Sequence, residues 1–450
     1  PLVERIVATL ATVEDLFRTH WRSSADTYLR HDRLPQTGDL FTNPVLADMY
    51  ERIVREAEAG GGSREQVIER ARTVWSQGFV AEAIDRFCRT QEVMDVTGRA
   101  HRGVLTGQDM AGWQAHVEAP IHYDYGRYRV FKCGPWSQGL VALQQLALLQ
   151  GFPLDGMSAT DPDFVHWIVE ASKLAFADRE AFYGDPNFVS VPIETLLSDA
   201  YNEQRRALIT AQASLELRPG QITGAGGRVD ARIAEGPRVA VGATGAGEPT
   251  VGRMGESKGD TVHFDIIDKD GNMVAATPSG GWLQSSPVIP ELGFCLGTRA
   301  QMFWLDESHP AALMPGRRPR STLSPTLAAR DGTPYMVWGT PGGDQQDQWI
   351  PQLLLRHIHC NMNLQESIDA PAWHSEHFPG SFWPRTSRPG VLVVESRMPE
   401  ATIAELKRRG HKVEIGDAWS EGRLVAASKI GQRRRAAANP RGMQAYAVGR

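Results

Sequence analysis

The chain has 450 residues and a formal net charge of −5 at pH 7, with 22% charged and 41% hydrophobic residues. This length allows one large domain or two to three ordinary ones, and the small net charge excludes bulk attraction to nucleic acid or an anionic membrane. The four cysteines are widely spaced and form no CxxC pair, which argues against a disulfide scaffold or a zinc ribbon and indicates reduced, buried thiols.

The start of the sequence bears on the cellular compartment of the protein. It begins at Pro1, without Met, in PLVERIVATL, which resembles the interior of a longer chain. We therefore expect further residues before Pro1, where any targeting segment would lie. No apolar run reaches the roughly 18 residues of a membrane span. The compartment stays open.

Helical periodicity dominates the first part. Apolar residues recur at three- and four-residue spacing over 49–58, 64–88, 140–149 and, most strongly, 163–182. Between them HYDYGRYRVF predicts a β-hairpin that turns about Tyr125 and Gly126.

The composition changes after about Pro219. Residues 219–260 are rich in Gly, Pro and small side chains and show little apolar periodicity, which predicts an exposed, mobile connection. Connections of this length are usually functional or disordered. We therefore divide the chain into a helix-rich portion (1–218), a linker (219–260) and a β-rich portion (261–450).

Strand patterns predominate from Thr261 onward. Asp270-Gly271-Asn272 indicates a hairpin turn between the first two strands, and helical patterns cover 345–359 and 399–409. Such an order favours layered α/β packing with antiparallel sheets. The predicted strands are TVHFDIID, NMVAAT, TLAAR, YMVWGT, VLVVES, HKVEIG, LVAASKI and AYAVG.

Several stretches contain metal-ligand or phosphate-binding residue types, and for each we prefer a structural explanation. DKDGN (268–272) lacks the Gly and Glu that an EF-hand loop needs at positions six and twelve. The histidines of HIHC (357–360) share no helix face, and HSEH (374–377) has no third ligand at zinc spacing. We expect surface or hydrogen-bonded core histidines and no metal. The basic runs 316–320 and 433–435 lack interleaved aromatic residues and should be solvated.

WGTPGGDQQDQW (338–349) is a more specific pattern. A predicted strand ends in Pro341-Gly342-Gly343, and a helix follows. Adjacent glycines at a helix N-terminus present bare N–H groups to a negative oxygen. Because GK[ST] is missing, this is not a phosphate loop. The alternatives are an oxyanion hole and a plain strand-to-helix turn.

Thr261 has two interpretations. A β-branched residue commonly opens a strand. Alternatively, Thr261 is an N-terminal nucleophile, whose hydroxyl first attacks the Asp260 carbonyl and cleaves the chain. The freed α-amine, with an ordinary pKa of about 7.7–8.0, can then act as a base. That chemistry needs a flexible upstream segment, which the predicted linker supplies.

Five ordered motifs resemble the gamma-glutamyltransferase family of N-terminal nucleophile hydrolases, over nearly the whole chain. They are GPWSQG (134–139), ASKLAFADREAFYGDPNFVSVP (171–192), DTVHFDIIDKDGNMVAATPS (260–279), RPRSTLSPT (318–326) and GTPGGDQ (339–345). The resemblance implies an α+β fold, a four-layer αββα sandwich. It also implies a precursor that is cut between Asp260 and Thr261 into a large and a small subunit, which stay associated.

The resemblance further implies roles for individual residues. Thr261 would be the nucleophile, and Ser279, where the family has Thr, would orient its hydroxyl. Gly342 and Gly343 would form the oxyanion hole. Ser321 and Thr322 would contact a substrate carboxylate. His263, two residues after the nucleophile, would be structural.

Other positions depart from the family pattern. Gly281 replaces an Asn that binds the glutamyl α-amino group, and Arg299 and Phe303 fall near the family's Gln and Asp. Gln301 would take the Gln position after a small register shift. Arginine repels an ammonium group and suits a carboxylate. The sequence is therefore similar to a divergent amidohydrolase branch.

The sequence thus predicts an autoprocessing amidohydrolase that cleaves a small, carboxylate-bearing amide through a threonine acyl-enzyme. We expect no cofactor, no nucleic acid and no membrane among its partners. Homo-oligomers of processed heterodimers are open. One alternative is a true gamma-glutamyltransferase or glutathione hydrolase. Another is an uncleaved homologue with a binding or structural role.

Overall fold

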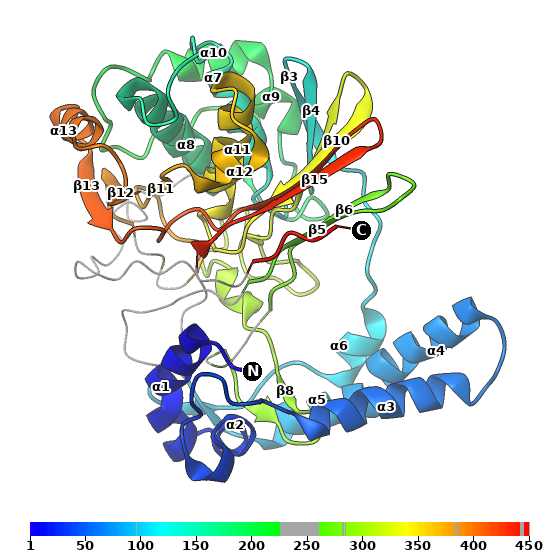
Figure 1. Cartoon of the computed structure of the whole chain (residues 1–450). Coiled ribbons are helices and arrows are strands. Elements are labelled where there is room, and N and C mark those ends of the chain that lie inside the picture. The colour runs from blue at the N-terminus through cyan, green and yellow to red at the C-terminus, as the bar shows by residue number, and fades with distance from the viewer. Residues whose placement is uncertain are drawn as a thin grey trace. The chain divides into compact units, whose positions relative to one another are not determined.

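The computed structural model describes residues 1–95, 97–225, 261–280, 283, 285–382, 385, 387–441 and 445–449. Within these residues the chain forms two compact units (Figure 1), one from 1–117 and 280–298, the other from 118–225, 261–279 and 299–449. Among the helices of the described ranges, none is long and apolar enough to cross a membrane.

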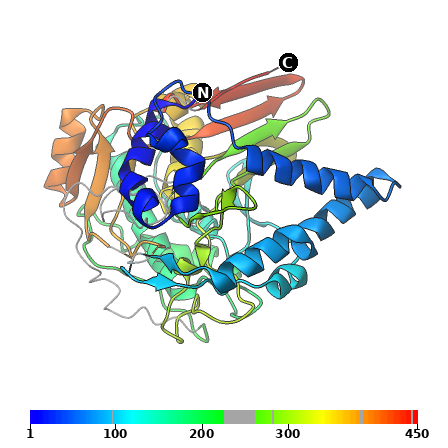
Figure 2. The same ribbon diagram turned by 90° about the horizontal axis from the view of Figure 1, so that it is seen from below.

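The first unit is mainly helical. Figure 2 shows α3 and α4, in blue, as an antiparallel pair. Two apolar clusters fill this unit, one around Phe17 and Trp21, the other around Ile53 and Ile84. Its elements are α1 (Glu4–Thr19), α2 (Arg22–Tyr28), η1 (Arg30–Asp32), α3 (Pro44–Glu58), α4 (Arg64–Gln77), α5 (Phe79–Thr90), β1 (Val93–Met94), β2 (Ala100–His101), α6 (Gly107–Gly112), β7 (Val288–Ile289) and β8 (Phe294–Cys295).

The prediction of one helix over 64–88 is wrong at a single residue. Gly78 has an extended backbone (φ −97°, ψ −151°) and separates α4 from α5. A Cβ at this position would lie 2.8 Å from the Val74 carbonyl oxygen. Only glycine therefore permits this sharp break, which apolar periodicity alone does not reveal.

The second unit contains the larger core and, within its described residues, three sheets, of which the smallest is the two-stranded β5–β6 hairpin. Its central helix α8 is buried along nearly its whole length. The elements are β3 (Ile121–Tyr125), β4 (Tyr128–Lys132), α7 (Leu140–Leu149), α8 (Pro162–Phe182), α9 (Ile193–Leu196), α10 (Asp199–Arg206), β5 (Phe264–Ile267), β6 (Met273–Ala276), η3 (Arg299–Met302), β9 (Thr326–Arg330), β10 (Thr333–Gly339), α11 (Gln346–His359), α12 (Leu364–Asp369), β11 (Trp373–Ser375), β12 (Val391–Glu395), α13 (Glu400–Arg408), β13 (Lys412–Gly416), β14 (Val425–Ile430) and β15 (Arg433–Ala438).

The main sheet is antiparallel throughout, with the order β15-β14-β10-β9-β4-β3. It joins distant parts of the sequence, because β4 pairs with β9 in the register Val130↔Ala328. The predicted 122–131 hairpin is confirmed as β3 and β4. Strands from both sides of Thr261 therefore belong to one hydrogen-bonded sheet.

Different elements cover the two faces of this sheet. Trp338 of β10 donates its indole N–H to the Ile350 carbonyl of α11, at 3.1 Å. The next residue, Gly339, lies against the ring of His263, just before the β5–β6 hairpin. Successive strand residues point to opposite faces. Helices thus pack on one side and the β5–β6 hairpin on the other, as Figure 1 shows.

The second sheet, β11-β12-β13, has one antiparallel and one parallel pair, so the expectation of purely antiparallel sheets is wrong here. The parallel pair β12–β13 is connected through α13. A parallel connection needs such a crossover, usually a helix.

The C-terminal prediction is also wrong. Residues 445–449 form no strand, whereas Arg433–Ala438 forms the edge strand β15. Its arginines show no apolar alternation, so the pattern indicated only a solvated basic run. They are exposed as expected, but backbone pairing with β14 makes the segment a strand.

Candidate active site

The β5–β6 hairpin places Thr261 next to Ser279. Thr261 is half-buried, and its Oγ1 donates to Ser279 Oγ at 3.1 Å. Val262 N–H donates to the Pro278 carbonyl oxygen at 3.1 Å, and this bond holds the two ends of the β5–β6 hairpin together. The predicted strand over 261–268 is shorter, because regular pairing begins at Phe264. Thr261 thus lies just outside the ladder.

His263 anchors this end of the hairpin. Its Nδ1 lies 2.7 Å from Thr277 Oγ1, and its Nε2 lies 3.0 Å from Asp265 Oδ1. Burial raises the pKa of Asp265, and the hydrogen bond from His263 opposes this effect. A Cβ at Gly339 would lie 2.4 Å from the imidazole ring, so only glycine fits there. His263 therefore packs against the last residue of β10.

The glycine turn follows three residues later, between β10 and α11. Gly342 and Gly343 are both buried, and Gly342 has φ +126°, a conformation that favours glycine. Within the described part of the chain, neither glycine N–H donates a hydrogen bond. Buried N–H groups are rarely left without an acceptor. Two such groups at the start of a helix can bind an oxyanion.

A buried ionic network supports this turn. Arg179 of α8 forms ion pairs with Glu180 and with Asp344, the residue after Gly343. Ser381 donates its N–H and its hydroxyl to Asp344, at 2.8 and 2.6 Å. The predicted roles included neither Arg179 nor Asp344, although both residues lie in the quoted motifs 171–192 and 339–345.

Arg320 completes the network. It is 2% exposed, and its Nη2 donates to Glu180 Oε1 at 2.7 Å. The expectation that the 316–320 run is solvated is therefore wrong for Arg320. Burial disfavours the ionised form of Glu180, but Arg320 and Arg179 outweigh burial and lower the pKa of this carboxyl.

Ser321 and Thr322 lie in a segment that pairs with the turn of GPWSQG. Ser321 N–H donates to the Trp136 carbonyl oxygen at 2.7 Å, and Gln138 N–H donates to the Ser321 carbonyl oxygen at 2.8 Å. Gln138 Nε2 also donates to the Gly343 carbonyl oxygen at 3.3 Å. Two motifs and the glycine turn are thus directly connected.

Arg299 and Gln301 lie on η3. The Arg299 guanidinium carbon lies 5.6 Å from the centre of the Phe382 ring. The Gln301 carbonyl oxygen accepts from Arg385 Nη2 at 3.2 Å. Asp260 and Gly281, which also entered the predictions, lie outside the described residues.

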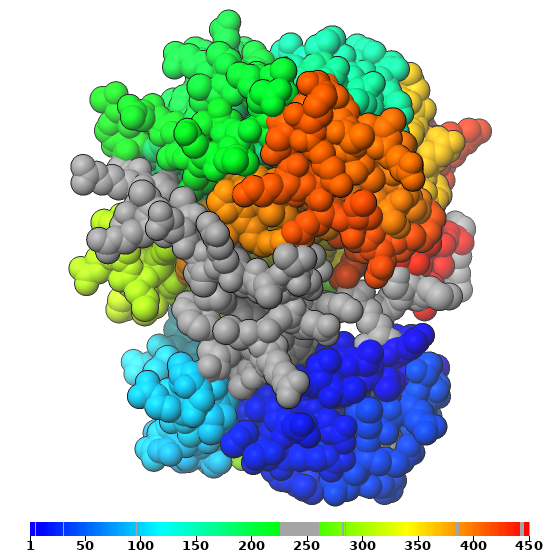
Figure 3. Space-filling model, turned by 90° about the vertical axis from the view of Figure 1, so that its left-hand side faces the viewer, coloured from blue at the N-terminus to red at the C-terminus, as the bar shows by residue number. Residues whose placement is uncertain are grey.

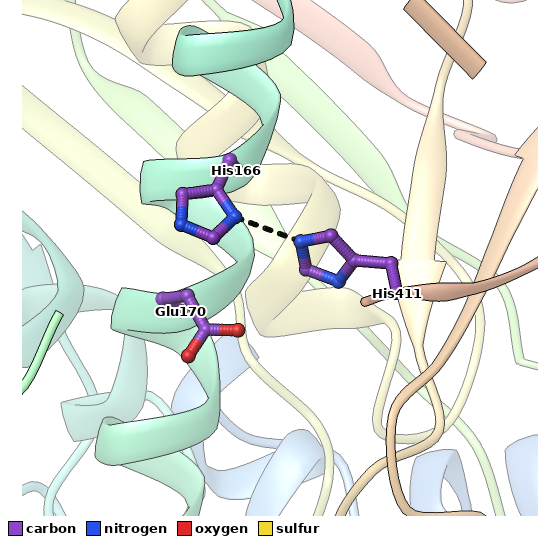
Figure 4. A group of neighbouring side chains, drawn as sticks. All are labelled: His166, Glu170 and His411. Atoms are coloured by element: carbon purple, nitrogen blue, oxygen red, sulfur yellow. Dashed lines mark hydrogen bonds between the residues drawn. The ribbon is translucent and has the colours of Figure 1, made fainter. Parts of the chain in front are cut away.

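One histidine–carboxylate cluster has the composition of a metal site. His166, Glu170 and His411 lie close together in the buried core (Figure 4). Most of their ligand atoms are already engaged, since Glu170 accepts from Lys173 and Arg218, and His166 Nδ1 lies 2.8 Å from His411 Nε2. The two cationic side chains that already pair with Glu170, Lys173 and Arg218, do not favour a further cation.

The cluster instead connects three segments. His166 Nε2 donates to the Thr210 carbonyl oxygen at 2.7 Å, so its Nδ1 accepts from His411. Burial lowers the pKa of His166, and that of His411 to about 2, which keeps both rings neutral. Figure 3 shows the segment after α10 (green) beside α13 (orange), where Ala213 N–H donates to the Arg409 carbonyl oxygen.

The histidines of HIHC and HSEH are confirmed as hydrogen-bonded. Tyr335 pairs with His357, and Asp155 pairs with His359. His374 lies between Glu421 and Glu376; although burial opposes ionisation, these carboxylates raise the pKa of His374 to about 10. DKDGN is confirmed as a turn, in which Asp268 Oδ1 accepts three backbone N–H groups.

The chain is similar to solved structures over its whole length. LmbA2991HD aligns with a TM-score of 0.90 and 50% identity, covering 100% of this chain and 75% of that chain. The cephalosporin acylase from Bacillus halodurans aligns with a TM-score of 0.77 and 25% identity, covering 100% of this chain and 72% of that chain. The mixed helix-and-sheet architecture is therefore that of the N-terminal nucleophile hydrolases.

Sequence comparison agrees. The oxamate amidohydrolase proenzyme of Klebsiella pneumoniae is 28% identical, over 92% of this chain and 66% of its own length. The chain spans about half of three further curated relatives, 46%, 62% and 58% of their lengths, which are glutathione hydrolase or glutathione hydrolase-like proenzymes. The profile of the gamma-glutamyltranspeptidase family matches residues 1–449, which confirms the resemblance noted in the sequence. The chain belongs to the gamma-glutamyltranspeptidase family.

Proposed function

We propose that this protein is an autoprocessing amidohydrolase with Thr261 as its nucleophile. The hydrogen bond from Thr261 Oγ1 to Ser279 Oγ, 3.1 Å long, carries this proposal. It orients a hydroxyl at the hairpin end that packs against β10, and β10 leads directly into the Gly342–Gly343 turn. The names of the relatives, which include proenzymes, an acylase and an amidohydrolase, support the same chemistry.

Maturation would begin with attack of the Thr261 hydroxyl on the Asp260 carbonyl carbon. The peptide C–N bond breaks, an ester forms, and the hydroxyl proton passes to the nitrogen. Water then hydrolyses the ester, which leaves an Asp260 carboxylate and a free Thr261 α-amine. One cut yields two polypeptides. The first contains the large-subunit portion (1–218) followed by the linker (219–260), and the second is the small subunit with residues 261–450.

Catalysis would reuse the same hydroxyl. The α-amine takes the proton of Thr261 Oγ1 while the oxygen attacks the substrate amide carbonyl. The N–H groups of Gly342 and Gly343 stabilise the tetrahedral oxyanion. The α-ammonium then protonates the leaving amine, and water hydrolyses the acyl-enzyme.

The two portions would stay together after cleavage. The backbone pairing of β4 with β9 crosses the proposed cut, and so does the Arg179–Asp344 ion pair. Gly220 N–H, at the start of the linker range, donates to buried Asp178 at 2.7 Å, which ties the end of the large portion to α8. Residues 226–260 lie outside the described part.

We further propose that the unit is part of a four-layer αββα sandwich. Helices α7 and α11 pack on one face of the main sheet, where they would form an outer layer. The β5–β6 hairpin packs on the other face, where it would belong to the opposing inner sheet of the sandwich.

The proposed substrate is a small amide with a carboxylate, recognised by Arg299 together with Ser321 and Thr322. An arginine favours a carboxylate and repels an ammonium group. We expect glutaryl- and oxalyl-type amides to be hydrolysed with higher kcat/KM than γ-glutamyl amides, which carry an α-amino group. Arg299→Gln should raise KM for the carboxylate-bearing amides about tenfold, because a charge-assisted hydrogen bond contributes about 1.5–3 kcal/mol.

Initial rates across a panel of p-nitroanilides, with and without an α-amino group, measure this preference. The matched control is Arg408→Gln, at an exposed arginine, which should change neither KM nor kcat/KM. A wild-type preference for γ-glutamyl donors would overturn the assignment of Arg299 and would support a true gamma-glutamyltransferase.

Ser279 should contribute through its hydrogen bond to Thr261. We expect Ser279→Ala to lower kcat about tenfold, since a neutral hydrogen bond is worth about 0.5–1.5 kcal/mol. Ser279→Thr retains the hydroxyl and should keep kcat within about threefold. Steady-state kinetics of the three proteins provide the comparison; equal kcat for all of them would mean that Ser279 does not orient Thr261.

A further inference from the structure

In the glycine turn, the direction of each N–H group is fixed by the direction of the carbonyl in the same peptide unit. In a planar trans peptide, the C=O of one residue and the N–H of the next point in opposite directions. The Gly342 N–H therefore shares a plane with the Pro341 carbonyl, and the Gly343 N–H with the Gly342 carbonyl. Whatever holds these two carbonyls also sets the directions of the two N–H groups.

Each carbonyl accepts a hydrogen bond from a buried side chain. Thr340 Oγ1 donates to the Pro341 carbonyl oxygen at 2.8 Å. Gln346 Nε2 donates to the Gly342 carbonyl oxygen. Both side chains are fully buried, with 0% exposure. The two N–H groups on the opposite sides of the same peptides donate to no described residue.

Gln346 is itself held at both ends of its amide. Its Oε1 accepts from Ser324 N–H at 3.1 Å, while its Nε2 reaches Gly342. The amide therefore cannot turn without breaking one of these bonds. Glycines at 342 and 343 have no side chains that would restrict their own rotation. The rigidity of the turn must come from its neighbours.

We propose that Thr340 and Gln346 are positioning residues that aim the Gly342 and Gly343 N–H groups at the oxyanion. The proposal rests on the function proposed above and adds the groups that preorganise its oxyanion hole. Donors that are fixed before the reaction need no reorganisation as charge develops, which is the source of their catalytic effect. The bound substrate has no oxyanion, which develops only as the tetrahedral species forms, so loss of either group should lower kcat and leave KM nearly unchanged.

Gln346→Glu tests the first group. Glutamate keeps the side-chain size and can still accept from Ser324 N–H, but above the pKa of the new carboxyl its second oxygen faces the Gly342 carbonyl oxygen without a proton and cannot donate. Removal of one oxyanion donor costs about 10²–10³ in kcat, which sets the upper limit. We expect a fall in kcat of about 10- to 100-fold, with KM within about threefold, for the best p-nitroanilide of the glutaryl, oxalyl and γ-glutamyl set.

Gln352→Glu is the matched control. Gln352 lies on the same helix, is 1% exposed, and donates its Nε2 to the Trp373 carbonyl oxygen at 2.8 Å, away from the turn. Gln352→Glu also introduces a buried carboxylate, which Arg356 Nη2, 3.4 Å from Gln352 Oε1, would partly compensate, and kcat should stay within about threefold of wild type.

Thr340 provides a pair of variants with little change in shape. Thr340→Val removes the hydroxyl and should lower kcat about tenfold, whereas Thr340→Ser keeps the hydroxyl and should restore kcat to within about threefold. Rescue by serine separates positioning from packing, because serine fills less space than valine.

The outcomes separate the two proposals. An active wild type whose Gln346→Glu and Thr340→Val variants retain kcat, or lose no more than Gln352→Glu, overturns the positioning roles and leaves the amidohydrolase proposal standing. A wild type that releases no p-nitroaniline and carries no acyl group on Thr261 overturns the proposed function, and the positioning roles with it.

Discussion

Thr261→Ala should leave the chain uncut between residues 260 and 261 and abolish amide hydrolysis. Alanine has no hydroxyl, so it can neither attack the Asp260 carbonyl nor form an acyl-enzyme. Loss of the nucleophile in comparable hydrolases costs on the order of 10⁶ in kcat. We expect activity on the p-nitroanilide panel to fall by at least about 10⁴. Intact-mass spectrometry and a denaturing gel report cleavage in the same samples.

Thr261→Ser is the matched control, because serine keeps a hydroxyl at the same distance from the backbone. It should be cut and retain measurable activity. Wild type should separate into two polypeptides under denaturing conditions and elute as one species under native conditions, held by β4 and β9. A cut Thr261→Ala variant would contradict the assigned role. An uncut, inactive wild type would instead support a binding or structural homologue.

Arg179→Met should produce the largest loss of stability among the substitutions considered. Arg179 has no exposed side-chain surface and contacts Glu180, Asp344 and Ser381. Removal of one partner of a buried ion pair typically costs about 3–5 kcal/mol, since the opposite charge stays buried without compensation. We expect such a loss in the free energy of unfolding, measured by urea denaturation with tryptophan fluorescence.

Two further variants test whether the loss of stability comes from the buried ion pair. Arg408 pairs with Glu405 at 2.6 Å but is 67% exposed, so Arg408→Met should cause no measurable change. The double variant Arg179→Met with Asp344→Asn should recover part of the loss, because it removes the uncompensated carboxylate. Equal stability of Arg179→Met and wild type would show that the network does not hold the turn. Since Asp344 follows Gly343, kcat should fall along with stability.

Local patterns predicted much of the secondary structure. Helix α7 matches residues 140–149, and α8 agrees with the predicted 163–182 within one residue. Apolar spacing identifies such helices, because one face of each turn must meet the core. The break at Gly78 and the strand β15 were not predicted, because neither produces a pattern of apolar spacing. A close contact and a strand pairing decide their conformations, and neither leaves an apolar period.

For the candidate site, the order of motifs predicted the family, and the profile match confirms it. Thr261, Ser279 and the glycine pair could be proposed because each belongs to a short motif in which residue type reflects chemistry. The roles assigned to these residues remain predictions. The hydrogen bond between Thr261 and Ser279 links positions 18 residues apart, and it depends on the hairpin between them.

The family, the order of the motifs and the residue types available for catalysis follow from the residue letters, because they depend on local composition. The contact of Arg179 with Asp344, the packing of His263 on Gly339, and the hydrogen bonds of Thr340 and Gln346 to the carbonyls of the glycine turn became visible in the folded chain. Some of these contacts, such as Arg179–Asp344 across 165 residues, join distant segments, and chain folding alone sets their geometry. The direction of a backbone N–H likewise depends on the orientation of its peptide plane in the folded chain, and residue identity alone does not reveal that orientation.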